Sequence, residues 1–211
     1  MKSKKILVTL LSAGLLVAVT IGGTLAYMQA QTEKKTNVFT VGEGLSGELK
    51  EPEWDGIEFG QTNPPAGADK DATLGKNLAV KFVPGRVIPK DPQVKNTSEG
   101  TTAWVAVTIA YENAANSKAA IEKFATIDWN TTDWAFNEDH TVAYYKTAVA
   151  SEEKTAPLFT KVTIKEEANT KQGDDLEMKN FDIVLDGYLV QQEGFENAET
   201  AMKAAYENIF K

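Results

Sequence analysis

The residue types that chemistry most often needs are scarce in this chain. His140 is the single histidine, and there is no cysteine. A cysteine nucleophile is therefore excluded, and a Ser-His-Asp triad would have to use His140. That histidine follows Asn137, Glu138 and Asp139, a sequence that predicts an exposed turn with a solvated ring. No HExxH motif occurs, and one histidine does not build the usual zinc protease site. The sequence thus predicts no catalytic residue.

Oxygen ligands gather in one short segment that holds Asp128, Asn130 and Asp133. Their spacing matches no known calcium loop, so a calcium ion here stays an open alternative and the sequence predicts no metal site. Carboxylates are plentiful enough for a glycosidase pair, but such a pair needs a cleft and a defined separation. Neither a Walker loop nor a GxGxxG motif occurs, so no cofactor is expected.

Aromatic residues are the remaining chemical candidates. They could form a platform on which sugar rings stack, but aromatic side chains more often fill a core and the space between two sheets, which is the interpretation we favour. The residues concerned are Trp104, Trp129, Trp134, Tyr144 and Tyr145.

The N-terminus has the order of a secretory signal peptide. Lysines at positions 2, 4 and 5 precede an apolar run over residues 6–21, and Gly22-Gly23 and small residues follow. This pattern predicts a signal peptide helix over residues 1–26, cleaved between Ala26 and Tyr27. A retained membrane anchor is the alternative, although the run is short for a span, which needs about 20 residues.

Charge and cysteine content describe the exported chain. The 211 residues include 22 basic and 30 acidic ones, and loss of residues 1–26 leaves 19 basic residues and a formal charge of −11. Such a surface repels nucleic acid, so no nucleic-acid partner is expected. An extracellular protein without disulfides depends on its core alone, which fits a product of a Gram-positive bacterium.

The leader, residues 27–49, ends in an alternating segment. Phe39, Val41, Leu45 and Leu49 all stand at odd positions, which predicts one strand with a buried face. Glycines at positions 42, 44 and 47 interrupt the segment and weaken its hold on its own sheet.

Residues 50–211 are expected to form one antiparallel β-sandwich with short peripheral helices. A proline- and glycine-rich loop is predicted over residues 50–77, a short helix over 114–124 with Asn113 as its N-cap, and a C-terminal helix over 196–210 capped by Asn197. Seven or eight strands at turn-marked spacing favour the all-β class. The clearest of these strands cover residues 78–83, 103–111, 142–147, 158–164 and 181–189.

Several segments together resemble the TasA/camelysin family. They are Gly22–Tyr27, Thr32-Glu33, Thr36–Gly42, the stretch from Val83-Pro84-Gly85 to Ala103–Val107, Leu158–Ile164 and Tyr188–Phe195. The chain departs from the family pattern at Met28 and Gln29, just after the export junction, where an aromatic and an acidic residue are usual.

The resemblance implies a jelly-roll-like sandwich that is exported with a SipW-type signal peptidase. It also implies a place on the cell surface or in the biofilm matrix, with other matrix proteins as further partners. Copies of the chain would form a fibre in which an N-terminal strand of one subunit completes the sheet of the next. On this expectation Phe39, Val41, Leu45 and Leu49 form the candidate donor strand; the alternative is that this strand pairs within its own domain. Camelysin-type relatives are labelled metallopeptidases, an activity that we do not transfer because the sequence offers no metal site.

Three functions follow in order of preference. The first is a structural fibre subunit of the matrix or cell surface. The second is a monomeric, non-catalytic adhesin that binds glycan or host protein through its aromatic loops. The third is a secreted hydrolase.

Overall fold

The fold was analysed on a computed structural model. It describes the backbone of residues 30–31 and 37–41 and the complete chain from residue 45 to 211. The predicted signal peptide and its cleavage site at Ala26 and Tyr27 lie outside these described residues.

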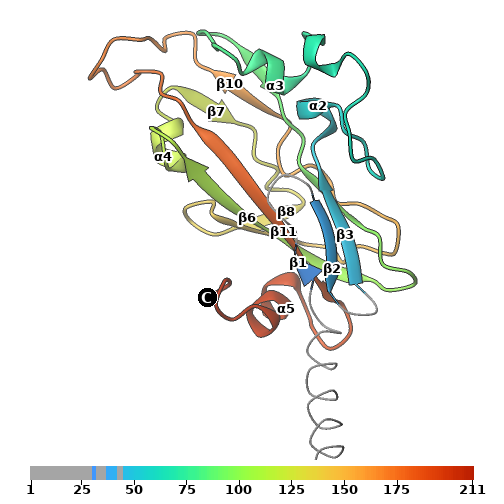
Figure 1. Cartoon of the computed structure of the whole chain (residues 1–211). Helices are drawn as coiled ribbons and strands as arrows, with labels where there is room; N and C mark the ends of the chain where they lie inside the picture. The colour runs from blue at the N-terminus through green and yellow to red at the C-terminus, as the bar shows by residue number, and fades with distance from the viewer. Residues whose placement is uncertain (1–29, 32–36, 42–44) are drawn as a thin grey trace, which may run out of the picture.

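The described chain is mainly antiparallel β-sheet, as the sequence predicts, in an arrangement consistent with a β-sandwich (Figure 1). The larger sheet has five strands in the order β1-β11-β6-β9-β8. Two smaller sheets have the orders β4-β10-β7 and β2-β3-β5. The strands of the large sheet are β1 (Ala30–Gln31), β6 (Ala103–Glu112), β8 (Trp134–Phe136), β9 (Val142–Tyr145) and β11 (Asp182–Gln191). Those of the smaller sheets are β2 (Asn37–Val41), β3 (Leu45–Lys50), β4 (Val87–Pro89), β5 (Gln93–Asn96), β7 (Ala125–Ile127) and β10 (Lys161–Ile164).

Two long strands, β6 and β11, form the backbone of the large sheet. They pair over their full length, from Asp182 opposite Glu112 to Gln191 opposite Ala103. Alternate residues of β6 face opposite sides, as its period of two requires. Val105 and Val107 enter the main core, whereas Trp104 and Ala106 face the other side of the sheet.

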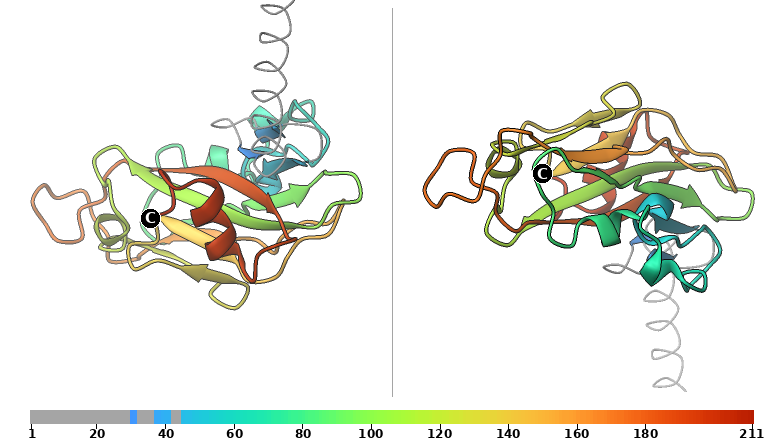
Figure 2. Two further views of the ribbon diagram at one scale, coloured as in Figure 1. Left: turned by 90° about the horizontal axis from the view of Figure 1, so that it is seen from below. Right: turned by 90° about the horizontal axis from the view of Figure 1, so that it is seen from above.

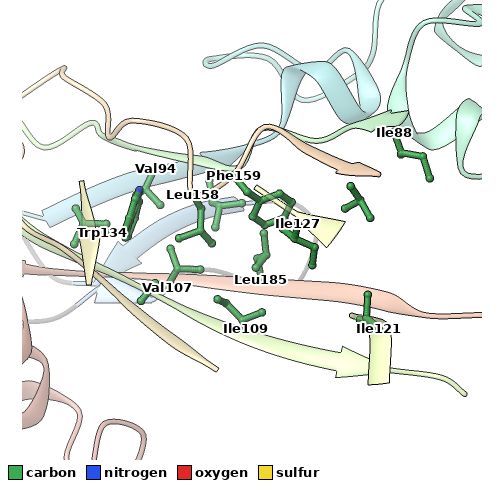
Figure 3. Close-up of a cluster of buried hydrophobic side chains, with 14 of the residues drawn as sticks. Ile88, Val94, Val107, Ile109, Ile121, Ile127, Trp134, Leu158, Phe159 and Leu185 are labelled. Atoms are coloured by element: carbon green, nitrogen blue, oxygen red, sulfur yellow. The ribbon is translucent and has the colours of Figure 1, made fainter. Parts of the chain in front are cut away.

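The main core lies between the large sheet and the two smaller ones (Figure 3). It joins Leu185 of β11 and Ile109 of β6 to Ile88 of β4 and Val94 of β5. Phe159, just before β10, is completely buried in the same cluster. The core therefore unites all three sheets in one body.

A second, smaller cluster covers the other face of the large sheet. Helix α5 (Ala198–Ala205) packs there against β11, β6 and β9, at the lower end of the view in Figure 1. The view from below in Figure 2 shows the same helix lying across these strands. The helix begins at its predicted cap, because the Asn197 side chain accepts a hydrogen bond from the Thr200 amide. It is shorter than the predicted 196–210.

The remaining helical elements are short. Three lie in the segment expected to be an irregular loop, and they are α2 (Pro52–Asp55), the 3₁₀ turn η1 (Ala68–Lys70) and α3 (Gly75–Leu78). Helix α4 (Lys118–Ile121) lies within the predicted helix 114–124. Its cap is Ser117 and not Asn113, because Asn113 adopts a left-handed conformation with φ 72° and cannot start a helix.

The strand predicted over residues 78–83 is wrong. Leu78 ends α3, and the chain then turns through Lys81, whose φ of 56° is left-handed. Leu78 and Phe82 still pack against the core, so their apolar character is used by a helical turn and not by a strand. Val80 is left 67% exposed, which a buried strand would not allow.

Candidate functional site

His140 lies in a turn as predicted, but its ring is not simply solvated. The ring stacks on Phe136 with centroids 4.4 Å apart and meets the edge of Trp129 at 5.0 Å. Burial, followed by the charge of Lys118, lowers the pKa of His140 below its ordinary value. Its Nδ1 is buried and has no hydrogen-bond partner within the described part of the chain. The histidine is thus part of an aromatic cluster at the margin of the core.

The oxygen-rich segment around Asp128 is tied into the sandwich by hydrogen bonds. The Asp128 carboxylate accepts bonds from the backbone amides of Thr160 and Lys161 at 2.9 and 2.8 Å and from the Thr160 hydroxyl. The Asn130 amide group donates to Asp133 at 2.9 Å, while its oxygen accepts from the Asp133 amide. These oxygens therefore join β10 to the neighbouring turn. No group of three or more metal-binding side chains occurs in the ranges that the structure describes.

The five aromatic residues do not share one surface. Trp104 and Tyr144 pack beneath α5 in the smaller cluster. Trp134, Trp129 and Tyr145 belong to the main core on the opposite face of the sheet. The Trp134 indole donates to the Ala156 carbonyl at 3.1 Å, so its polar atom is satisfied inside the protein. They act as packing residues, which is the interpretation favoured from the sequence.

The segment predicted as one donor strand is two strands. Phe39 and Val41 belong to β2, Leu45 and Leu49 to β3, and the two pair antiparallel with Val41 opposite Leu45. Leu45 and Leu49 are each 2% exposed and form part of the main core. Burying a leucine is worth about 1.5–3 kcal/mol, so β3 is integral to this body. In the described leader, β1 and β2 are outer strands of their sheets, whereas β3 lies between two neighbours.

Strand β3 also lies against β11, since a Cβ atom on Gly47 would lie 2.9 Å from the Leu189 side chain. Strand β11 has β6 on one side. On its other side, the only described residues that pair with β11 are Ala30 and Gln31, which lie opposite Leu189 and Tyr188. Phe181 and the first part of β11, from Asp182 to Leu185, line a cleft of about 660 Å³. The opposite wall of this cleft is formed by Leu49, Trp54, Ile88 and Val162. The cleft beside β11 therefore combines apolar side chains with charged ones, since Lys50, Glu51 and Asp182 also line it.

On one side of the cleft, charged groups join α2 to the chain that follows β4. Lys90, which follows β4 and is buried, forms an ion pair with Glu51, and its ammonium lies 4.5 Å from the centre of the Trp54 ring. The Asp91 carboxylate accepts a hydrogen bond from the Glu53 amide at 2.7 Å. Loss of solvent on burial raises the pKa of Asp91 to about 6. These contacts hold α2 against the chain between β4 and β5.

Close backbone packing fixes α3 beside the same wall. A Cβ atom on Gly75 would lie 1.9 Å from the Pro89 carbonyl oxygen and 2.7 Å from the Trp54 ring. Only glycine lets the helix approach β4 so closely. The position of α3 in turn places Ala79, Val80 and Phe82 on the rim of the cleft.

Sequence reasoning did not find this cleft. Its walls come from β3, the helical segment 52–82, β4, β10 and β11, which are far apart in the sequence. One signal is present in the sequence: residues 78–83 are largely apolar, although their pattern predicts a strand. A strand edge next to a cleft depends on which strands are neighbours, and strand alternation alone does not contain that information.

Comparison of the chain with protein-family models, with curated proteins and with solved structures gave no match. Within the described residues, no helix has the length and apolar character needed to cross a membrane.

Proposed function

We propose that this chain is an exported structural protein of the cell surface or biofilm matrix whose copies assemble into a fibre by strand exchange. Export rests on the signal-peptide pattern of residues 1–26, and the fibre role on the resemblance described above. In the proposed exchange, residues 27–41 leave their own body and add to the β11 edge of another copy. The role requires neither catalysis nor a cofactor.

The observation that carries the proposal is the β11 edge that borders the cleft from Phe181 to Leu185. An exposed strand edge offers a row of backbone donors and acceptors, and an added strand can satisfy them. The apolar wall opposite this edge supplies burial for alternate side chains of that strand. Exchange of an identical element between copies needs no new contact type, since each copy already pairs Ala30 and Gln31 with β11.

The burial of β3 limits the segment that the proposed exchange could use. Leu45 and Leu49 belong to the buried body, so the exchanged segment has to end before β3. Deletion of residues 27–49 would remove these core residues and unfold the protein, so it is unsuitable as a test. A reversible lock between β2 and β3 tests the proposal without removing anything.

Thr40 and Ser46 are suited to such a lock. They are directly opposite in the β2–β3 register. The Ser46 carbonyl accepts from the Thr97 amide and the Ser46 amide donates to the Ser98 hydroxyl, so both backbone groups face away from β2. Thr40 and Ser46 are thus a non-hydrogen-bonded antiparallel pair. The Cα atoms of such pairs lie about 4.5 Å apart, which is within the range that a disulfide can join. The chain has no other cysteine with which the pair could react.

The experiment compares T40C/S46C in residues 27–211 with the unmodified chain, by electron microscopy and size-exclusion chromatography. We expect fibres from the unmodified chain and the reduced variant, and monomers from the oxidised variant. The control, T108C/V142C, crosslinks β6 and β9 at another opposite pair whose backbone groups do not bond each other. It should assemble in both redox states. Fibres from oxidised T40C/S46C would overturn strand exchange, and a strictly monomeric unmodified chain would overturn the fibre role in favour of the adhesin.

A further inference from the structure

One exposed surface of the protein combines apolar side chains with positive charge. The valines Val80, Val83 and Val87 are 67%, 46% and 47% exposed, and they are three of the four large apolar side chains exposed in the described part of the chain. Lys81 and Arg86 lie between them, and Arg86 is the only arginine of the protein. We refer to these five residues as the valine patch.

The valine patch is compact because the chain folds back within it. The Arg86 amide donates to the Val83 carbonyl at 3.1 Å, and Gly85 adopts a left-handed φ of 76° in the same turn. The Gly85 amide also bonds the Ile164 carbonyl, which fixes the turn to the end of β10. Val83 and Val87 are thus presented at the two ends of a fixed turn.

The charge of this region differs from that of the whole protein. Residues 75–90 contain four basic residues and no acidic one, although the chain has a formal charge of −8. Two of the four are neutralised nearby, since Lys90 pairs with Glu51 and Lys76 lies 3.2 Å from Asp69. Neither Lys81 nor Arg86 has an ion-pair partner among the described residues. Their charge is available to an acidic partner.

A second copy of the chain offers a matching acidic surface at its other end. Glu99, Glu193 and Glu196 are exposed there. The turns that carry them are neighbours, because the Gln192 amide donates to the Thr102 carbonyl at 2.9 Å. This end is the lower one in Figure 1, where α5 lies, and α3 and the turn that follows it lie at the upper end.

The same lower end is where the leader joins the body. Leu45 begins β3, and its neighbour Ser46 bonds Thr97, close to Glu99. A strand added to β11 in the direction of β1 runs antiparallel to it, so its C-terminal end leaves near Phe181. That exit lies on the cleft, whose rim includes Val80. The lower end of the donor copy is therefore brought towards the patch of the acceptor.

From these observations we infer that the valine patch is a docking surface for the acidic end of a second copy, formed by Glu99, Glu193 and Glu196. This inference rests on the proposed strand exchange and adds a contact between the two bodies. The contact is heterologous, with different surfaces on each copy, and repeats head to tail into an open filament. The valines supply buried apolar area, and Lys81 and Arg86 set the partner and its orientation.

The test is a charge swap in residues 27–211. K81E/R86E and E193K/E196K should each raise the concentration needed for fibres at least about tenfold, because like charges then oppose each other across the contact. The quadruple variant restores opposite charges and should assemble near the concentration of the unmodified chain. K171E/K211E is the control: it reverses two other exposed lysines and should assemble normally. Far-UV circular dichroism and thermal melts check that all variants fold.

The outcomes separate this inference from the proposed function. If K81E/R86E assembles as readily as the unmodified chain, or if the quadruple variant is not rescued, the docking surface is refuted, while a block by oxidised T40C/S46C would still support strand exchange. If the unmodified chain never assembles, both proposals fail. Loss of binding to phosphatidylglycerol vesicles by K81E/R86E without loss of assembly would identify the patch as a membrane contact and overturn the inference.

Discussion

Asp91 makes the stability of the cleft wall depend on pH. Burial raises the pKa of Asp91 to about 6 from an ordinary value of 3.8, so the folded protein holds this proton more tightly than the unfolded chain. Between these two values the folded state binds more protons, and its stability must fall as pH rises. Above pH 6 the full penalty of the buried charge is present. Asp91→Asn removes the charge and keeps an oxygen that accepts from the Glu53 amide.

The size of the effect follows from the shift. A change of about 2 pKa units corresponds to about 3 kcal/mol if it is transferred in full. Asp91 is only partly buried, and solvent screening reduces the value, so we expect about 1–2 kcal/mol. The variant also loses the bond that Gln93 Nε2 donates to Asp91 Oδ2 at 3.1 Å, a cost that lowers its stability at each pH. The diagnostic quantity is therefore the pH dependence of the difference between variant and unmodified chain.

The assay is urea unfolding followed by tryptophan fluorescence at pH 8, 6 and 4. The free energy of unfolding of Asp91→Asn, relative to the unmodified chain, should be higher at pH 8 than at pH 4 by about 1–2 kcal/mol. Asp174→Asn provides a control of opposite sign, because its hydrogen bond from the Leu176 amide lowers the pKa of Asp174. There the unmodified chain should keep its advantage down to about pH 4 and lose it only in a further measurement at about pH 3, because the pKa of Asp174 lies below its ordinary value of 3.8. A difference at Asp91 that is constant with pH, or that grows as pH falls, would refute the reasoning.

Two further substitutions test the packing of the body. Asn96→Ala should lower the free energy of unfolding by about 3 kcal/mol or more, since the completely buried Asn96 donates to the Thr101 and Val149 carbonyls and accepts from the Ser98 amide; a loss below 1 kcal/mol in urea unfolding would contradict this. Asn197→Ala should cost about 1 kcal/mol by removing the cap of α5, whereas Asn197→Asp should retain most of it. Equal losses in both Asn197 variants, measured by thermal melts, would argue against a capping role.

The parts of the fold that the sequence predicted are those where local pattern and tertiary contact agree. Val105, Val107 and Ile109 alternate with Trp104 and Thr108, and β6 is a strand with two differently covered faces. Helix α5 was predicted because Asn197 is a good cap and apolar residues follow at helical spacing. In both cases one element uses one periodicity from end to end.

Other elements could not be predicted because their apolar residues serve two structures. The alternation from Phe39 to Leu49 continues across a hairpin, since Val41 and Leu45 are opposite in the register and the odd positions fall on one face of both strands. Gly75 was not recognised either. Its need for close approach to Pro89 is apparent only when α3 and β4 are neighbours.

The cleft could not be predicted either, because it too depends on which elements are neighbours in the fold. The proposed function uses this same cleft. The main core described from residue 45 onwards includes Leu45 and Leu49, which β3 itself supplies. Release of the leader would break the pairs of β1 with β11 and of β2 with β3. An exchanged leader would re-form β11 pairing on another copy and gain contacts along the cleft. The balance between monomer and fibre would then depend on protein concentration. A disulfide that locks β2 to β3 would keep the protein monomeric at every concentration.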